Sequence, residues 1–152
     1  MSAFSNYLEN AILNHFLRNN STSSPATVFL ALHASGGSSP TAPGDDGTTA
    51  FDTECAGANA NGWTSYERKV VTFSSPSNGV TTNSATVTFD AVDAGEGPVT
   101  ITGLSIWTDQ RAGTNVGASG NMLFQGAVDA AKTLSANDVA SFPSAALTVT
   151  VD

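Results

Sequence analysis

The segment VTITGLSIWT, Val99–Thr108, decides the fold class. In its first half, Val99 and Ile101 alternate with threonines, which is the two-residue period of a strand with one buried face. The alternation changes phase at Gly103, and a glycine inside a strand is typical of a β-bulge. We therefore predict a β-strand over residues 99–108 with a bulge at Gly103.

Similar strand-like segments lie on both sides of this stretch, separated by turn-forming runs such as Pro76–Gly79 and Gly95–Pro98. No helical segment separates consecutive strands, which argues against a parallel α/β fold. About seven short strands at this spacing predict a mainly β fold, an antiparallel β-sandwich or a jelly-roll-like barrel. The predicted strands are 26–33, 67–74, 84–89, 99–108, 121–128, a short edge strand at 132–135, and 146–152.

One α-helix is predicted at the N-terminus, over residues 4–18. Apolar residues recur there at i, i+3 and i+4, Ser2 or Ser5 can cap the start, and the polar run NNSTSSP at 19–25 ends the helix. Leu13 and Leu17 make the helix apolar on more than one face. We therefore expect it to be pressed against a sheet or against a neighbouring subunit.

The chain of 152 residues is expected to form a single domain, with the helix in residues 1–20 and the sandwich in residues 26–152. The segment from about residue 34 to about residue 65 is long and rich in Gly, Ser and Thr. A connection of this length inside a compact domain is usually functional or an arm. We expect an extended surface loop that becomes ordered only against a partner.

Charge and composition exclude several classes of protein. Asp and Glu number 13 and Lys and Arg number 5, so the net charge is -8, and binding to nucleic acid or to an anionic membrane surface is not expected. One cysteine and two histidines argue against a dense zinc site and a disulfide scaffold. The longest apolar run, Val28–Leu32, is far shorter than the roughly 20 residues of a membrane-spanning helix.

No catalytic constellation is visible. The sequence has no G-x-S-x-G motif, and His15 and His33 are interpreted as ordinary packed or surface histidines. Cys55 lies in the predicted loop, where nothing would hold a Cys–His pair in the geometry of nucleophilic catalysis. The acidic run Asp90–Gly97 lacks the spacing of a calcium loop and is interpreted as solvated turn residues, with a structural calcium left open. We predict a protein that is not an enzyme, with no catalytic, metal-binding or cofactor-binding residues and no cofactor.

Apolar and aromatic side chains are the better candidates for a protein interface, because such residues dominate interface energetics. One group lies on the predicted helix and a second follows the long loop. The interface candidates are Phe4, Tyr7, Leu8, Ile12, Phe16, Trp63 and Tyr66.

Seven segments of the chain resemble, in order and spacing, a family of small tailed-phage virion structural proteins commonly described as phage tail fibre proteins. Asn137, where the family has a glycine before Asp138, and Glu67, where it has alanine, are departures. The resemblance implies a structural role in the virion without chemistry. The matching segments are Tyr7–Leu17 (YLENAILNHFL), Pro25–Leu32 (PATVFLAL), Ser65–Arg68 (SYER), Gly103–Asp109 (GLSIWTD), Gly120–Ala127 (GNMLFQGA), Lys132–Asp138 (KTLSAND) and Ala145–Asp152 (AALTVTVD).

Two functions are compatible with this resemblance. The first is a capsid decoration (cement) protein on the outside of the head, since the chain is small, acidic and without a fibre-shaft repeat. The alternative is a tail fibre or tail-associated host-contact protein. In either case we expect a virion protein, assembled in the host cytoplasm, that contacts the major capsid protein or other virion proteins. We also expect a homo-oligomer, with three copies as the expected number.

Overall fold

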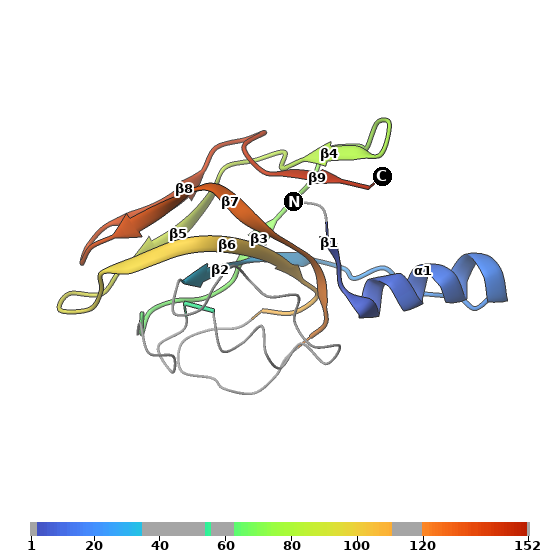
Figure 1. The fold of residues 1–152 in the computed structure, drawn as a ribbon, viewed down its shortest axis with the longest axis horizontal. Helices are drawn as coiled ribbons and strands as arrows, with labels where there is room; N and C mark the ends of the chain where they lie inside the picture. The colour runs from blue at the N-terminus through green and yellow to red at the C-terminus, as the bar shows by residue number, and fades with distance from the viewer. Residues whose placement is uncertain (1–2, 35–53, 56–62, 111–119, 152) are drawn as a thin grey trace.

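The computed structural model describes residues 3–34, 54–55, 63–110 and 120–151 of the chain (Figure 1). It confirms a mainly β fold with antiparallel sheets and one N-terminal helix, α1 (Asn6–Arg18). The strands are β1 (Ala3–Phe4), β2 (Val28–Ala34), β3 (Lys69–Val71), β4 (Val80–Thr82), β5 (Val87–Ala91), β6 (Val99–Trp107), β7 (Met122–Leu134), β8 (Val139–Phe142) and β9 (Thr148–Thr150).

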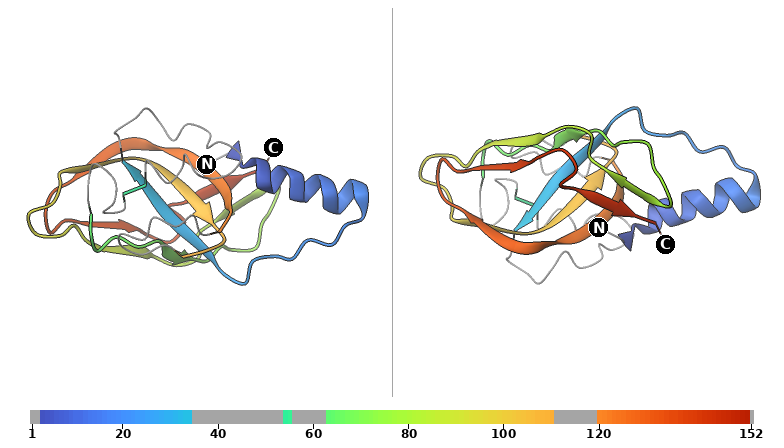
Figure 2. Two further views of the ribbon diagram at one scale, coloured as in Figure 1. Left: turned by 90° about the horizontal axis from the view of Figure 1, so that it is seen from below. Right: turned by 90° about the horizontal axis from the view of Figure 1, so that it is seen from above.

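The largest sheet has five strands in the order β1-β7-β6-β2-β3, and every neighbouring pair in it is antiparallel. Two further pairs, β4–β9 and β5–β8, form a second layer over this sheet (Figures 1 and 2). Among the described residues, no strand pairing joins β7 to β8, so the two layers do not close into a barrel.

The strand that decides the fold class is confirmed as β6, near the middle of the five-stranded sheet. Its register against β7 shifts between Ile101 and Gly103, where the sequence predicts a bulge. Ile101 pairs with Lys132 whereas Gly103 pairs with Ala127, so Thr102 stands opposite four residues of β7. The bulge therefore lies mainly on the β7 side.

This bulge also corrects one prediction. Residues 132–135 are not a separate edge strand, because β7 is continuous through 13 residues and pairs with β6 up to Leu134. Of the four bulged residues 128–131, the last three are exposed and carry no apolar alternation, so the sequence pattern breaks although the strand does not. The short strands β4 and β8 were also missing from the prediction. The chain turns into β4 at Asn78 and Gly79, which both have positive φ, 50° and 74°.

The predicted loop over residues 34–65 lies mostly outside the described residues. Within it, Glu54 and Cys55 add to the edge of β2: Glu54 forms a β-bridge with His33, and the Cys55 N–H donates to the Leu32 carbonyl at 3.0 Å. This segment is therefore joined to the sheet at that point.

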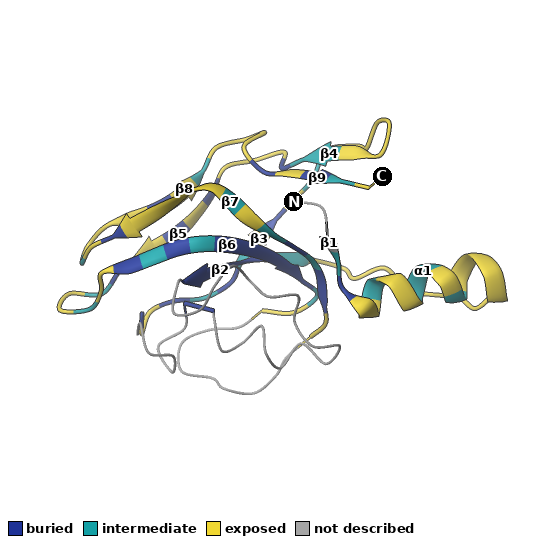
Figure 3. Ribbon diagram, in the orientation of Figure 1, coloured by how far each residue is buried: buried dark blue, intermediate teal, exposed yellow. Residues whose placement is uncertain are grey.

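The core lies between the two layers (Figure 3). Its aromatic part consists of Trp63, Tyr66, Phe89 and Phe142. Ring centroids of successive members of this group are 5.5, 6.0 and 6.3 Å apart, within the range of favourable aromatic contacts. The Trp63 indole N–H donates to the Ala91 carbonyl at 3.1 Å, so its polar group is satisfied.

A buried ion pair fixes the aromatic group to the five-stranded sheet. Arg68 donates from Nε and Nη2 to the two carboxylate oxygens of Glu54, each at 2.9 Å, and both side chains are fully buried. The Tyr66 hydroxyl donates to the same carboxylate at 2.9 Å and accepts the Leu32 N–H at 3.0 Å. The Arg68 guanidinium also stacks 3.8 Å from the centroid of the Trp107 ring. Burial, and then the Glu54 charge, raise the pKa of Tyr66 well above its usual value, so the phenol stays a donor.

The acidic turn between β5 and β6 binds the backbone at Thr64 and Ser65, between the core residues Trp63 and Tyr66. Asp93 accepts the Ser65 N–H at 2.6 Å, and Glu96 accepts the Thr64 N–H at 2.7 Å. Both acids flank the turn at residues 94–95, are half-buried, and have structural partners. The Ser65 N–H bond is the main cause that lowers the pKa of Asp93 below 3.8.

The Arg68→Met variant should lower the free energy of unfolding by about 3–5 kcal/mol, because it leaves the Glu54 carboxylate buried without its partner. Urea denaturation measures the loss. The matched control is Lys69→Met, which removes the neighbouring cation. Lys69 pairs with Glu67 and Asp90 at the surface, where such pairs contribute about 0–1 kcal/mol. Equal losses in the two variants would contradict the assignment.

Asp93 should contribute to stability in a pH-dependent way. Its pKa is lowered in the folded protein, so the contribution is complete above the ordinary value of 3.8 and is lost as the pH falls through the lowered value. We expect Asp93→Ala to melt at a lower temperature than the wild type at neutral pH, with the gap shrinking in strong acid. Thermal melts across this range measure the gap; a gap that widens on acidification would refute the assignment.

Candidate interface at the N-terminal helix

The α1 helix ends at the predicted residue Arg18, but it begins at Asn6 and not at Phe4, because Ala3 and Phe4 form β1. Ser5 is the N-cap, and its hydroxyl oxygen accepts the Leu8 N–H at 3.2 Å. The C-cap is Asn19, which has a positive φ of 54°. Glu9 lies in the first turn and Arg18 in the last, so both charges complement the helix dipole.

The N-terminal end of α1 is fixed to the five-stranded sheet. β1 pairs with β7 through Phe4 and Phe124, whose rings are 5.4 Å apart. The Ser5 N–H donates to the Leu123 carbonyl at 3.0 Å, and the Ser5 hydroxyl donates to the Met122 carbonyl. From this attachment the helix projects away from the sandwich (Figures 1 and 2).

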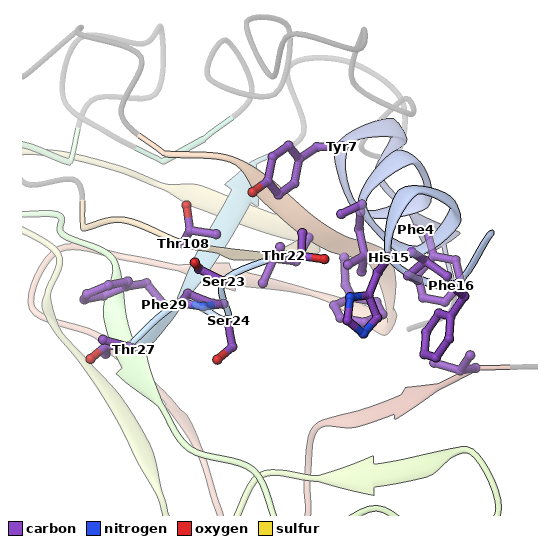
Figure 4. Close-up of a pocket in the computed structure, with 18 residues that line it drawn as sticks. Phe4, Tyr7, His15, Phe16, Thr22, Ser23, Ser24, Thr27, Phe29 and Thr108 are labelled. Carbon is purple, nitrogen blue, oxygen red and sulfur yellow. The ribbon is translucent and has the colours of Figure 1, made fainter. Parts of the chain in front are cut away.

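A groove of about 770 Å³ lies between α1, the returning segment 22–27 and the nearest ends of β2 and β7 (Figure 4). Among the described residues, its lining contains no Asp, Glu, Lys or Arg. The lining residues are Phe4, Tyr7, Leu8, Ala11, Ile12, His15, Phe16, Thr22, Ser23, Ser24, Pro25, Ala26, Thr27, Phe29, Thr108, Leu123, Phe124 and Val151. The size is within the roughly 300–1,000 Å³ of typical binding pockets, and the walls are mainly apolar.

The same helix carries a second apolar surface, which begins at the groove edge with Phe16 and extends to the side turned away from the groove. It consists of Leu13, Phe16 and Leu17, and we call it the outer ridge. The three side chains follow i, i+3, i+4 spacing and are 53, 75 and 77% exposed. No residue of α1 is buried. The expectation that the helix is pressed against a sheet is therefore met only at its first turn, and most of its apolar surface is uncovered.

The structure divides the sequence-predicted interface residues into two groups. Phe4, Tyr7, Leu8, Ile12 and Phe16 all line the groove. Trp63 and Tyr66, in contrast, are 0 and 1% exposed. This corrects the expectation for these two residues. Their rings fill the space between the layers, and their polar atoms are bonded inside the protein, so they offer no surface to a partner.

Sequence reasoning missed the far wall of the groove. Phe29, Leu123 and Phe124 come from β2 and β7, which are distant in the chain, and no local pattern connects them to the helix. The outer ridge had a signal, because Leu13 and Leu17 break the one-sided pattern of the helix. That pattern predicted a second apolar face, and the structure shows it to be exposed.

The polar groups that could suggest catalysis are buried. The Ser105 hydroxyl accepts the Trp107 indole N–H at 2.7 Å and is hydrogen-bonded to His33 Nε2 at 2.6 Å. Ser105 and His33 are 0 and 1% exposed, so no substrate can reach them. Burial, and then Glu54, raise the pKa of the Cys55 thiol far above its usual value, and the thiol is inert.

The described residues provide neither a metal-binding cluster nor a membrane-spanning helix. They hold no group of three or more His, Cys, Asp or Glu residues placed to bind a metal ion. Within the same residues, no helix is both long and apolar enough to cross a membrane.

Comparison with known proteins supplies a family. A family model described as podophage GP4 fiber I protein gp80 matches residues 3–150. No curated protein sequence matches the chain significantly.

Ser5→Ala should lower the free energy of unfolding by about 1 kcal/mol, because it removes the N-cap bond to Leu8 and the bond to Met122. Urea denaturation followed by circular dichroism measures this loss. Ser23→Ala, at an exposed serine outside any helix or strand, is the control and should leave stability unchanged. If both variants match the wild type, Ser5 does not hold the helix in place.

Proposed function

The chain belongs to the podophage GP4 fiber I protein gp80 family, and from this membership we propose that it is a tail-fibre component of a podophage particle. The observation that carries the proposal is the family match, which covers residues 3–150 and thus nearly the whole chain. As a member of this family the protein is a structural, non-enzymatic part of the virion.

The family description favours the fibre alternative over capsid decoration. Decoration of the head was expected from the small size, the acidic charge and the lack of a shaft repeat. Those features describe one compact domain, and they do not specify the position of that domain on the particle. The family description names a fibre and gives capsid decoration no support.

A fibre component must be held by its neighbours, and the N-terminal helix is the surface that we propose for this contact. The sandwich buries its aromatic residues inside, whereas the helix leaves large apolar side chains exposed. Contiguous exposed apolar surface of this kind marks protein interaction sites. Phe4, Tyr7, Leu8, Ile12 and Phe16 stay in the proposed interface because they line its groove.

Immunogold electron microscopy of intact particles tests the location. An antibody raised against the purified chain should label the tail, and particles lacking this protein should carry no label. Label spread over the head would overturn the fibre proposal and restore capsid decoration.

A further inference from the structure

The helix has two apolar surfaces that point in different directions. The groove is lined by Leu8, Ile12 and His15 on one side of α1, whereas the outer ridge (Leu13, Phe16 and Leu17) extends over the other side. Phe16 lies at the border and belongs to both. The ridge spans Leu13 to Leu17, about 6 Å along the helix, so the two surfaces lie side by side over its last turns.

We propose that both surfaces are covered by other copies of this same chain: the outer ridge of one copy packs into the groove of the next. The chain carries both halves of this contact, an uncharged apolar groove and an apolar ridge with no cover in its own fold. The inference gives the expected homo-oligomer a contact surface, and it does not depend on where on the particle the protein lies.

The distribution of charge supports a second copy as the occupant. Two chains of net charge -8 repel each other, so a stable contact must keep the acidic groups apart. The part of the groove lining that the structure describes has no Asp, Glu, Lys or Arg residue, and the ridge has none among its three members. Glu9 and Arg18 cancel within the helix. The helix is therefore a surface by which two such acidic chains can meet without burying a charge.

The two surfaces also determine the symmetry of the assembly. In a two-fold dimer both partners use the same patch and every contact occurs twice, so the ridge would have to enter the groove in both directions at once. Packing of ridge into groove is a head-to-tail contact, in which each copy has one neighbour on either side. Such a contact closes only with three or more chains, and it covers both apolar surfaces of every helix.

Size-exclusion chromatography with light scattering on the purified full-length protein provides the first test. We expect an assembly of three or more chains. A monomer at all concentrations would overturn the proposal and leave the groove to a different virion protein, and a dimer would overturn the head-to-tail geometry. Either result, combined with tail label in immunogold microscopy, would leave the fibre proposal intact.

Charged variants test the surface itself. Leu13→Asp/Leu17→Asp on the ridge and Ala26→Asp in the groove wall should each reduce the assembly to monomer. All three positions are exposed, so the fold is kept, which circular dichroism verifies. The matched control is Val139→Asp in β8, at a valine that is 48% exposed and lies at the other end of the molecule (Figure 1). It should assemble as the wild type does; an intact assembly in the ridge and groove variants would refute the proposal.

Mixing the two monomeric variants tests whether ridge and groove contact each other. The ridge variant keeps a normal groove and the groove variant keeps a normal ridge, so one intact contact can form between them. We expect the equimolar mixture to give a one-to-one heterodimer that does not grow further. A mixture that remains monomeric would overturn the head-to-tail contact.

Discussion

The buried ion pair between Glu54 and Arg68 is the interaction on which the rest of this structure depends. Removing two charges from water costs several kcal/mol per ion, and only close geometry offsets that cost. Here Arg68 donates twice to one carboxylate and stacks on Trp107, while Tyr66 adds a third bond to Glu54. The pair connects three parts of the chain. Glu54 lies in the segment 54–55, Arg68 lies just before β3, and Trp107, on which Arg68 stacks, lies at the end of β6. Pairing of the charges thus places Tyr66, and with it the aromatic group, in the core.

This arrangement explains why the interaction surface is at the helix. Several aromatic residues after residue 54 could have anchored a protein interface, but they are buried in the core. Trp63 and Phe89 pack between the layers, and Trp107 covers Arg68. Large apolar side chains at the surface then concentrate on α1, which the sandwich touches only at its start. The sandwich holds the start of α1, and the exposed apolar side chains lie along the rest of the helix.

The elements that the sequence predicted correctly are those whose hydrophobic period is visible within one stretch of the chain. The helix over 4–18 and the strand over 99–108 have clear periods, and Gly103 marked the bulge. The prediction divided the continuous strand β7 because residues 129–131 of its bulge face solvent. Trp63 and Tyr66 were assigned to an interface because the long segment before them gave no strand pattern. Their burial depends on Glu54 and Phe89, and contacts between residues distant in sequence leave no periodic signal. For the same reason only the helix side of the groove was predicted.

The short length and the exposure of α1 are the strongest physical reasons to expect assembly. Isolated helices of fewer than about 12–15 residues are marginal in water, and most helical stability in proteins comes from packing of an apolar face. The 13 residues of α1 have an N-cap and an attached first turn, but none of them is buried. Its last turns therefore lack the packing that usually holds a helix of this length, although they carry Phe16 and Leu17. Cover from a neighbouring chain would supply that packing. Folding of these turns and association of the chains would then draw on the same buried apolar surface, so each stabilises the other.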